Sequence, residues 1–238
     1  MRQIRRWHNY PDSNALKLDV IKQIADFAQQ TLSTHACFRI VLAGGSTPKA
    51  VYQGLRNIKT DWSGWHIYYG DERCLPVGAA ERNDTMVQQS WLSHVAIPPE
   101  QIHAIPAELG AIEGANAYLD ILNSIDTFDL VLLGLGEDGH TASLFPGHDL
   151  GDEAGAPDVL AVHDAPKPPS ERISLSANRL SHARQVWFLV TGDTKQSAID
   201  NWQHEHMIPA SSICPKNGID IYTELALDDM AGESGSQH

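Results

Sequence analysis

Cysteine is scarce in this 238-residue sequence, which contains only Cys37, Cys74 and Cys214. Three scattered cysteines are too few for a disulfide framework, and no Cys-x-x-Cys spacing indicates a structural zinc site. This pattern is typical of a reduced compartment, so we expect a cytoplasmic protein.

Long hydrophobic runs are missing as well. No stretch approaches the roughly 18 uninterrupted apolar residues that a membrane helix requires. Near the start, Arg2, Arg5 and Arg6 are followed by Trp7–Asp12 and not by an apolar core with a small-residue cleavage site. We therefore expect neither secretion nor a membrane-spanning segment.

Positive charge is in short supply. Lys and Arg number 17 against 30 Asp and Glu, which gives a formal net charge of -13. This field opposes non-specific binding to nucleic acid or to an anionic membrane, and we expect neither as a partner. A phosphorylated ligand would need a local basic pocket. Composition does not fix the oligomeric state, and a monomer is compatible with it.

Strand and helix patterns alternate along the chain. Strands are predicted at Cys37–Ala43, Trp65–Tyr69, Gln101–Ile105, Phe128–Leu133, Ile173–Ser176 and Gln185–Val190. Helices are predicted at Ala15–Leu32 with Ser13 or Asn14 as cap, after the turn Gly44–Thr47 with Pro48 at the first position, at Asp84–Leu92, at Ile112–Ile125, and up to Trp202.

This alternation implies βαβ crossovers. We predict an α/β fold with a mainly parallel central sheet and helices on both faces, a Rossmann-like three-layer sandwich. The composition shows no sharp break, so residues 1–230 are predicted to form a single domain, followed by a polar tail at residues 231–238.

Ligands of open α/β sheets bind beyond the carboxyl ends of the strands, so the strand-to-loop junctions are the places to compare. The turn Gly44-Gly45-Ser46-Thr47 can aim backbone N–H groups and hydroxyls at an anion, next to a helix N-terminus. It lacks the Gly-Lys-Ser/Thr ending of a nucleotide P-loop, which favours a small phosphorylated molecule over ATP. The alternative is an ordinary turn with a Ser/Thr helix cap.

Cations occur at three other junctions. Arg73 and Lys195 follow predicted strands, and the stiff connector Ala165–Pro169 leads to Arg172. Together they would supply the positive charge that a phosphate dianion needs. Singly, each could be a surface charge paired with a neighbour, Arg73 with Glu72 and Lys195 with Asp193.

The segment Gly134-x-Gly136-x-x-Gly139 matches the dinucleotide-binding pattern literally. It lies in the middle of the chain, however, and Glu137 and Asp138 would face a pyrophosphate with like charge. A nicotinamide site is therefore disfavoured.

Asp138 and His140 lie in the same turn, two residues apart. A carboxylate at this spacing can orient an imidazole and raise its basicity, which would make His140 a proton-transfer group. The competing interpretation is a structural histidine that caps the following helix. The remaining histidines form no recognisable metal-binding set.

Taken in order, the motifs resemble the 6-phosphogluconolactonases, which share a fold with the glucosamine-6-phosphate deaminases. The matching segments are Ala43–Pro48, Gly70–Pro76, Gly134–Pro146, Pro166–Ser174, Thr191–Lys195 and Pro209–Ser211. The deaminases carry Asp-Gly-His-Ile-Ala-Phe-Asn-Glu-Pro, and Phe145 here occupies the place of that glutamate. The resemblance therefore favours lactone hydrolysis over ring opening and isomerisation.

The resemblance implies a substrate, 6-phospho-D-glucono-1,5-lactone, opened to 6-phosphogluconate in the oxidative pentose phosphate pathway without a metal or cofactor. It also implies roles: His140 activates water, Asp138 supports His140, and Asp71 contacts sugar hydroxyls. The phosphate would be held by the turn Gly44, Gly45, Ser46 and Thr47 together with Arg73, Arg172 and Lys195. A deaminase-type enzyme and a non-catalytic sugar-phosphate-binding module are the alternatives.

Overall fold

The computed structural model describes residues 3–228. In this part of the chain the strands are β1 (Arg5–Asn9), β2 (Phe38–Leu42), β3 (Trp65–Tyr69), β4 (Asp71–Arg73), β5 (Phe128–Leu133), β6 (Val159–Val162), β7 (Arg172–Leu175), β8 (Ala183–Val190) and β9 (Ile219–Thr223). The helices are α1 (Ser13–Leu32), α2 (Ser46–Leu55), α3 (Asn83–Ser90), α4 (Ala111–Leu122), α5 (Ala177–Ser181) and α6 (Gln196–Gln203). The polar tail predicted at 231–238 lies outside the described residues.

Six strands form the central sheet in the order β1-β9-β8-β5-β2-β3. All their pairings are parallel. The inner strand β5 is buried along its whole length, which is why Phe128–Leu133 reads as a nearly continuous apolar run. The predicted mainly parallel sheet is confirmed.

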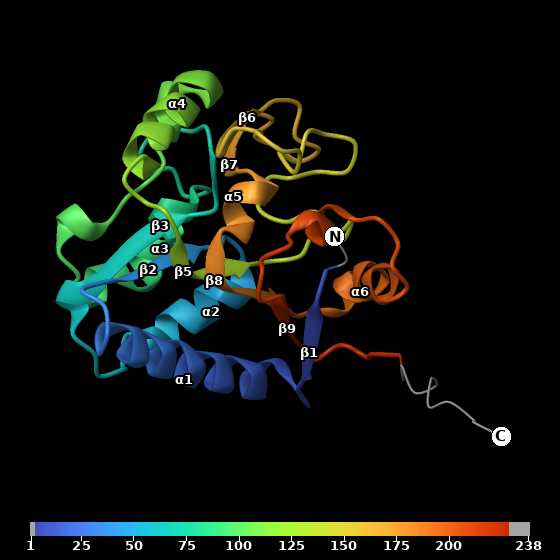
Figure 1. Cartoon of the computed structure of the whole chain (residues 1–238), viewed down its shortest axis with the longest axis horizontal. Coiled ribbons are helices and arrows are strands. Elements are labelled where there is room, and N and C mark those ends of the chain that lie inside the picture. The colour runs from blue at the N-terminus through green and yellow to red at the C-terminus, as the bar shows by residue number, and fades with distance from the viewer. Residues whose placement is uncertain (1–2, 229–238) are drawn as a thin grey trace.

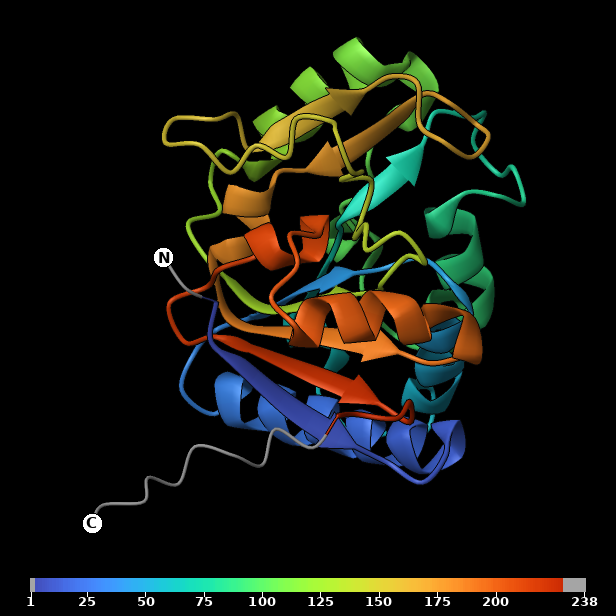
Figure 2. The ribbon, with the colours of Figure 1, turned by 90° about the vertical axis from the view of Figure 1, so that its right-hand side faces the viewer.

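Helices cover both faces of this sheet, as predicted. In Figure 2, α1 lies on one side of strands β1 and β9 and α6 lies on the other. Helix α1 buries Leu16, Val20, Ile24 and Phe27, which recur at the helical spacing seen in the sequence. Within the described residues, no helix is long and apolar enough to cross a membrane.

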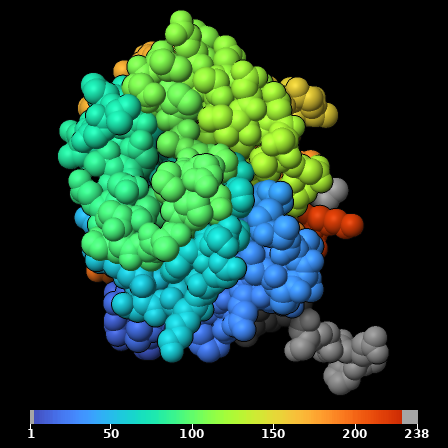
Figure 3. All heavy atoms as spheres, turned by 90° about the vertical axis from the view of Figure 1, so that its left-hand side faces the viewer, coloured from blue at the N-terminus to red at the C-terminus, as the bar shows by residue number. Residues whose placement is uncertain are grey.

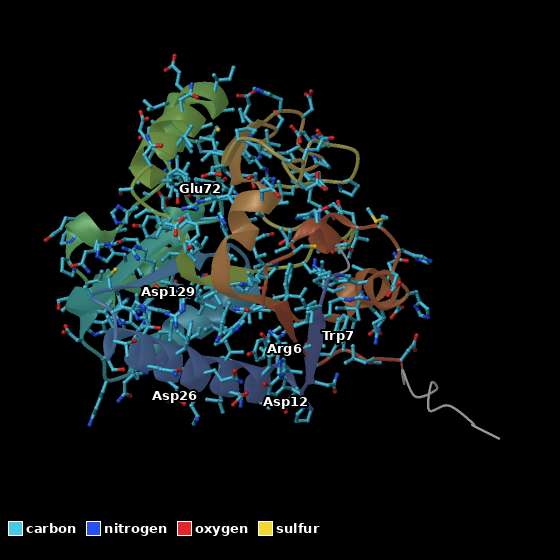
Figure 4. The ribbon with its side chains drawn as sticks, in the orientation of Figure 1. Arg6, Trp7, Asp12, Asp26, Glu72 and Asp129 are labelled. Carbon is cyan, nitrogen blue, oxygen red and sulfur yellow. The ribbon has the colours of Figure 1, made fainter. Side chains whose placement is uncertain are left out.

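Two helix starts differ from the prediction. Asp12 (labelled in Figure 4), and not Ser13 or Asn14, caps α1 by accepting a hydrogen bond of 2.8 Å from the backbone N–H of Ala15. Helix α2 begins at Ser46, which makes Pro48 its third residue. Proline is tolerated there because the first-turn N–H groups have no partner within the helix.

A second, smaller sheet was not predicted. It has the order β4-β7-β6 and is antiparallel. Helix α4 packs against β6 and β7 at the top of Figure 1. Figure 3 shows the side of the molecule where the green segments that carry α3 and α4 form the surface. The second sheet matters because its strand β4 brings Asp71 and Arg73 towards the end of the central sheet.

The strand predicted at Gln101–Ile105 is wrong. The chain makes a 3-10 turn at Pro99–Gln101, and only an isolated bridge joins Ile102 to Ile67. Pro98, Pro99 and Pro106 surround the segment. Proline lacks the N–H that a strand ladder uses, so the prolines on both sides keep any pairing confined to this short segment.

Candidate active site

A cavity of about 460 Å³ opens at the carboxyl ends of three neighbouring strands, β2, β5 and β8. The second sheet closes its other side. Seven of the residues predicted from the sequence line this cavity: Gly44, Gly45, Asp71, Arg73, His140, Arg172 and Lys195. The placement follows the general rule for ligand sites in open α/β sheets.

His140 lies in the turn that follows β5. Its Nδ1 is 2.5 Å from Oδ1 of Asp138, and its backbone N–H donates to the same oxygen over 3.1 Å. Because the carboxylate accepts the Nδ1 proton, the neutral imidazole keeps its lone pair on Nε2. The sequence left the contact between these residues open, and the structure brings them together.

The Asp138 carboxylate is about half-exposed, with 44% of its side chain accessible. Partial burial opposes its ionisation, but the hydrogen bonds from His140 outweigh that effect and hold the pKa of Asp138 below its usual range. Asp138 therefore stays negative over the pH range in which an imidazole changes charge.

The backbone of this turn is shaped by Gly136 and Gly139. A Cβ on Gly136 would lie 2.0 Å from Nδ1 of His140, so only glycine leaves room for the imidazole. Gly139 has φ of 81°, in the left-handed region that favours glycine. The pattern that resembles a dinucleotide motif thus serves to seat His140.

Phe145 packs against His140, with a distance of 4.8 Å between their ring centroids. It is buried, and it lines the cavity. The guanidinium of Arg172 lies 5.7 Å from the same ring centroid. At the position where the resemblance to deaminases would require a glutamate, this site presents an apolar ring.

Asp71 begins β4 and is buried, yet it lines the cavity. Its Oδ1 accepts from Nδ2 of Asn83 over 3.1 Å, and its Oδ2 accepts from Oγ of Ser143 over 2.6 Å. Ser143 comes three residues after His140. The loop that carries Asp138 and His140 therefore also contacts Asp71, through Ser143.

Four cations line the cavity: Arg73, Lys167, Arg172 and Lys195. Arg73 donates to the carbonyl of Glu81, and its buried Nε has no hydrogen-bond partner among the described residues. Lys195 lies 3.9 Å from Glu137. Among the described residues neither cation forms the ion pair that the alternative interpretation expected: Glu72 accepts backbone N–H groups, and the ion pair of Lys195 is with Glu137.

Arg172 is held by the connector that precedes it. Its Nε donates to the carbonyl of Pro169 over 3.2 Å, and its Nη2 donates to the carbonyl of Lys167 over 2.9 Å. Burial lowers the pKa of Arg172, but an arginine stays protonated in proteins all the same. The same contacts place Lys167 at the cavity.

The turn after β2 is divided between two hollows. Gly44 and Gly45 line the main cavity, whereas Ser46 and Thr47 line an adjacent one of about 260 Å³. Oγ1 of Thr47 is 2.6 Å from Oγ1 of Thr191, which ties this turn to the segment that carries Lys195. The hydroxyls of Ser46 and Thr47, which were predicted to face the phosphate, therefore lie beside the main cavity and not in it.

Sequence reasoning did not identify Asn83, Ser143 or Lys167. Ser143 and Lys167 both lie inside segments already noted for their resemblance, Gly134–Pro146 and Pro166–Ser174, so that signal was present. Asn83 had no such signal. Within residues 3–228 no group of three or more His, Cys, Asp or Glu side chains is arranged to hold a metal ion.

Comparison with known proteins agrees with this geometry. Residues 11–222 match the family model of glucosamine-6-phosphate isomerases/6-phosphogluconolactonase. A 6-phosphogluconolactonase of Mycobacterium leprae is 34% identical over 234 residues, covering 92% of this chain and 94% of that protein. One of Streptomyces coelicolor is 37% identical over 178 residues, covering 67% and 68%.

A solved structure shows the same likeness in three dimensions. The crystal structure of 6-phosphogluconolactonase from Thermotoga maritima superposes with a TM-score of 0.82 at 25% identity, covering 92% of this chain and 98% of that one. The family model, over residues 11–222, includes every helix and strand from α1 to β8 and most of β9. Strand β1 lies before its start. The chain belongs to the family of glucosamine-6-phosphate isomerases and 6-phosphogluconolactonases.

Proposed function

We propose that this protein hydrolyses 6-phospho-D-glucono-1,5-lactone to 6-phospho-D-gluconate, the second step of the oxidative pentose phosphate pathway. The observation that carries the proposal is the Asp138–His140 pair at one end of a cavity lined by four cations. An oriented base beside a strongly positive pocket suits a substrate with a carbonyl at one end and a phosphate at the other.

The reaction requires a base and then an acid. His140, with Nδ1 engaged by Asp138, has Nε2 free to take a proton from water as the water oxygen attacks C1 of the lactone. The bond between C1 and the ring oxygen then breaks, and the proton on Nε2 passes to that oxygen. The carboxylic acid that forms ionises at neutral pH, so water is consumed and one proton is released.

The other residues would bind the substrate. The backbone of Gly44 and Gly45 and the side chains of Arg73, Arg172 and Lys195 would hold the phosphate, with Ser46 and Thr47 supporting the turn. Asp71 would accept hydrogen bonds from sugar hydroxyls. This route uses no metal and no organic cofactor.

The Phe145 side chain disfavours the deaminase-type alternative. Ring opening and isomerisation of an amino sugar would use a carboxyl where this site has a buried phenyl ring against His140. Ammonia release from glucosamine 6-phosphate would be the direct sign of that chemistry, and we expect none.

We further propose that residues 1–230 act as one lactonase domain in the cytoplasm. The cavity draws on both sheets, which supports a single functional unit. The three cysteines are free thiols, in keeping with a reducing compartment.

The test is hydrolysis of freshly made lactone, coupled to 6-phosphogluconate dehydrogenase and corrected for the spontaneous reaction. His140→Ala should lose about 100-fold to 10,000-fold in rate, the usual contribution of such a base. His35→Ala, which removes an exposed histidine, is the matched control. Binding of 6-phosphogluconate by a wild-type protein that gives no turnover would support the binding-module alternative instead.

A further inference from the structure

The Asp71 carboxylate is held from two sides by donors that are themselves buried. Asn83 is 3% exposed and Ser143 is 1% exposed, and each donates to a different oxygen of Asp71. Asn83 Nδ2 donates also to the backbone carbonyl of Asp71 over 2.9 Å. The orientation of the carboxylate within the cavity is therefore fixed.

Asn83 is locked by its surroundings. Its backbone N–H donates to Oε1 of Glu72 over 2.8 Å, at the start of α3. A Cβ on Gly44 would lie 2.1 Å from Oδ1 of Asn83, so the amide packs directly against the turn after β2. This contact explains why glycine occupies position 44 independently of any phosphate.

Ser143 belongs to the loop that carries His140. Ala142 has φ of 48°, a left-handed conformation that is unfavourable for a residue with a Cβ. The loop is fixed on both sides of Ala142, because Thr141 Oγ1 donates to the carbonyl of Gly134 over 2.8 Å and Ser143 Oγ donates to Asp71. The strained residue thus turns Ser143 towards the second sheet.

We propose that Ser143 is a positioning residue: its hydroxyl holds Asp71 in the orientation that accepts sugar hydroxyls and keeps Asp71 in a fixed relation to His140. Each carboxylate oxygen has two lone pairs. One on each is used by Asn83 and Ser143, so the remaining pairs have set directions into the cavity. The inference rests on the proposed lactonase function and assigns the recognition of its sugar ring.

The proposal predicts that Ser143 acts through Asp71 and not independently. In the intact enzyme, Ser143→Ala should lower kcat/KM about tenfold to hundredfold, mainly through a higher KM, because a hydrogen bond to a charged group is lost. In an Asp71→Ala background, which lacks the acceptor, the same change should cost less than about twofold. Such a double-mutant cycle isolates the pairwise coupling.

Two further variants keep the test decisive. Ser143→Cys retains nearly the same volume but donates weakly, so it should fold and lose activity in the same direction by a smaller factor. Ser90→Ala removes another buried hydroxyl, in α3 away from the cavity, and should leave kcat/KM unchanged.

Additive losses in the cycle would overturn the proposal, and so would a coupling of Ser143 to His140 with none to Asp71. Both results require a wild-type enzyme that hydrolyses the lactone. A wild-type protein without that activity would instead refute the proposed function, so the two failures are distinguishable.

Discussion

Oδ1 of Asp138 accepts from both the backbone N–H and the ring Nδ1 of His140, over 3.1 and 2.5 Å. One oxygen thus fixes the position of the residue and the tautomer of its ring. In the proposed mechanism, the carboxylate would also stabilise the imidazolium that forms when His140 takes a proton from water.

Asp138→Asn should therefore lower kcat on the lactone by about 100-fold or more with a small change in KM, because the amide can orient the ring but cannot stabilise its charge. Steady-state kinetics at several pH values would measure this. Asp126→Asn, a change of the same type in an exposed loop away from the cavity, should leave kcat unaltered. An Asp138→Asn enzyme with wild-type kcat would exclude an electrostatic role for Asp138.

Lys195 offers the sharpest test of the proposed phosphate site. Arg172 also holds the connector through the carbonyls of Lys167 and Pro169, so Arg172→Ala would disturb the cavity wall as well as remove a charge. Among residues 3–228, by contrast, the ion pair of the Lys195 side chain is a long one of 3.9 Å with Glu137.

Lys195→Gln should raise KM for the phosphorylated lactone about tenfold to hundredfold, which corresponds to roughly 1.5–3 kcal/mol for a contact with a charged group. The KM for unphosphorylated gluconolactone should change little. Lys22→Gln, at an exposed ion pair on α1, is the control. Equal losses on both lactones would remove Lys195 from the phosphate site.

Much of the fold could be predicted because its signals are local. The strand β5 is an uninterrupted apolar run, and the turn that carries Asp138 and His140 follows it directly. The edge strand β1 was missed because Arg5–Asn9 is largely polar. It is a strand only because the distant β9 offers it a parallel partner.

The site was less accessible to sequence reasoning wherever it depends on packing between distant segments. Asp71 and Ser143 are 72 positions apart, and no pattern in either segment predicts their hydrogen bond. The antiparallel second sheet, which pairs Asp71 with Ser174, likewise could not be predicted from the sequence. The contact between Asp138 and His140 follows from their closeness in the sequence, whereas the contact between Asp71 and the same loop arises only from the tertiary structure.

Gly136 gives a prediction about shape. Gly136→Ala should reduce activity as severely as removal of His140, because the added methyl would occupy the place of the imidazole, 2.0 Å from its Nδ1. Gly70→Ala is the matched control. A Cβ there would meet its nearest atom, the carbonyl oxygen of Leu42, at an ordinary 3.6 Å.

Activity and thermal unfolding should be measured together for these two variants. We expect Gly136→Ala to lose most of its activity and Gly70→Ala to retain it. Full activity in Gly136→Ala would show that the turn can move aside, and that the close approach of Gly136 does not fix His140.

Glu72 (labelled in Figure 4) gives a prediction about pH and stability. Its carboxyl is fully buried and accepts backbone N–H groups from Arg73, Asn83 and Asp84, each over 2.8 Å. Burial raises the pKa of Glu72 from 4.5 to about 7, against the opposing effect of these hydrogen bonds.

The folded state therefore binds a proton more tightly at Glu72 than the unfolded state does. The contribution of Glu72 to the free energy of unfolding is greatest below the unfolded pKa of 4.5 and is lost as pH rises to about 7, by a total of about 3 kcal/mol. Chemical denaturation of wild type and Glu72→Gln at pH 5, 6 and 7 would measure it. The free-energy difference between the two proteins should change across this window, with wild type gaining relative stability towards low pH. A difference that stays constant with pH would mean that the buried carboxyl is already ionised at pH 5.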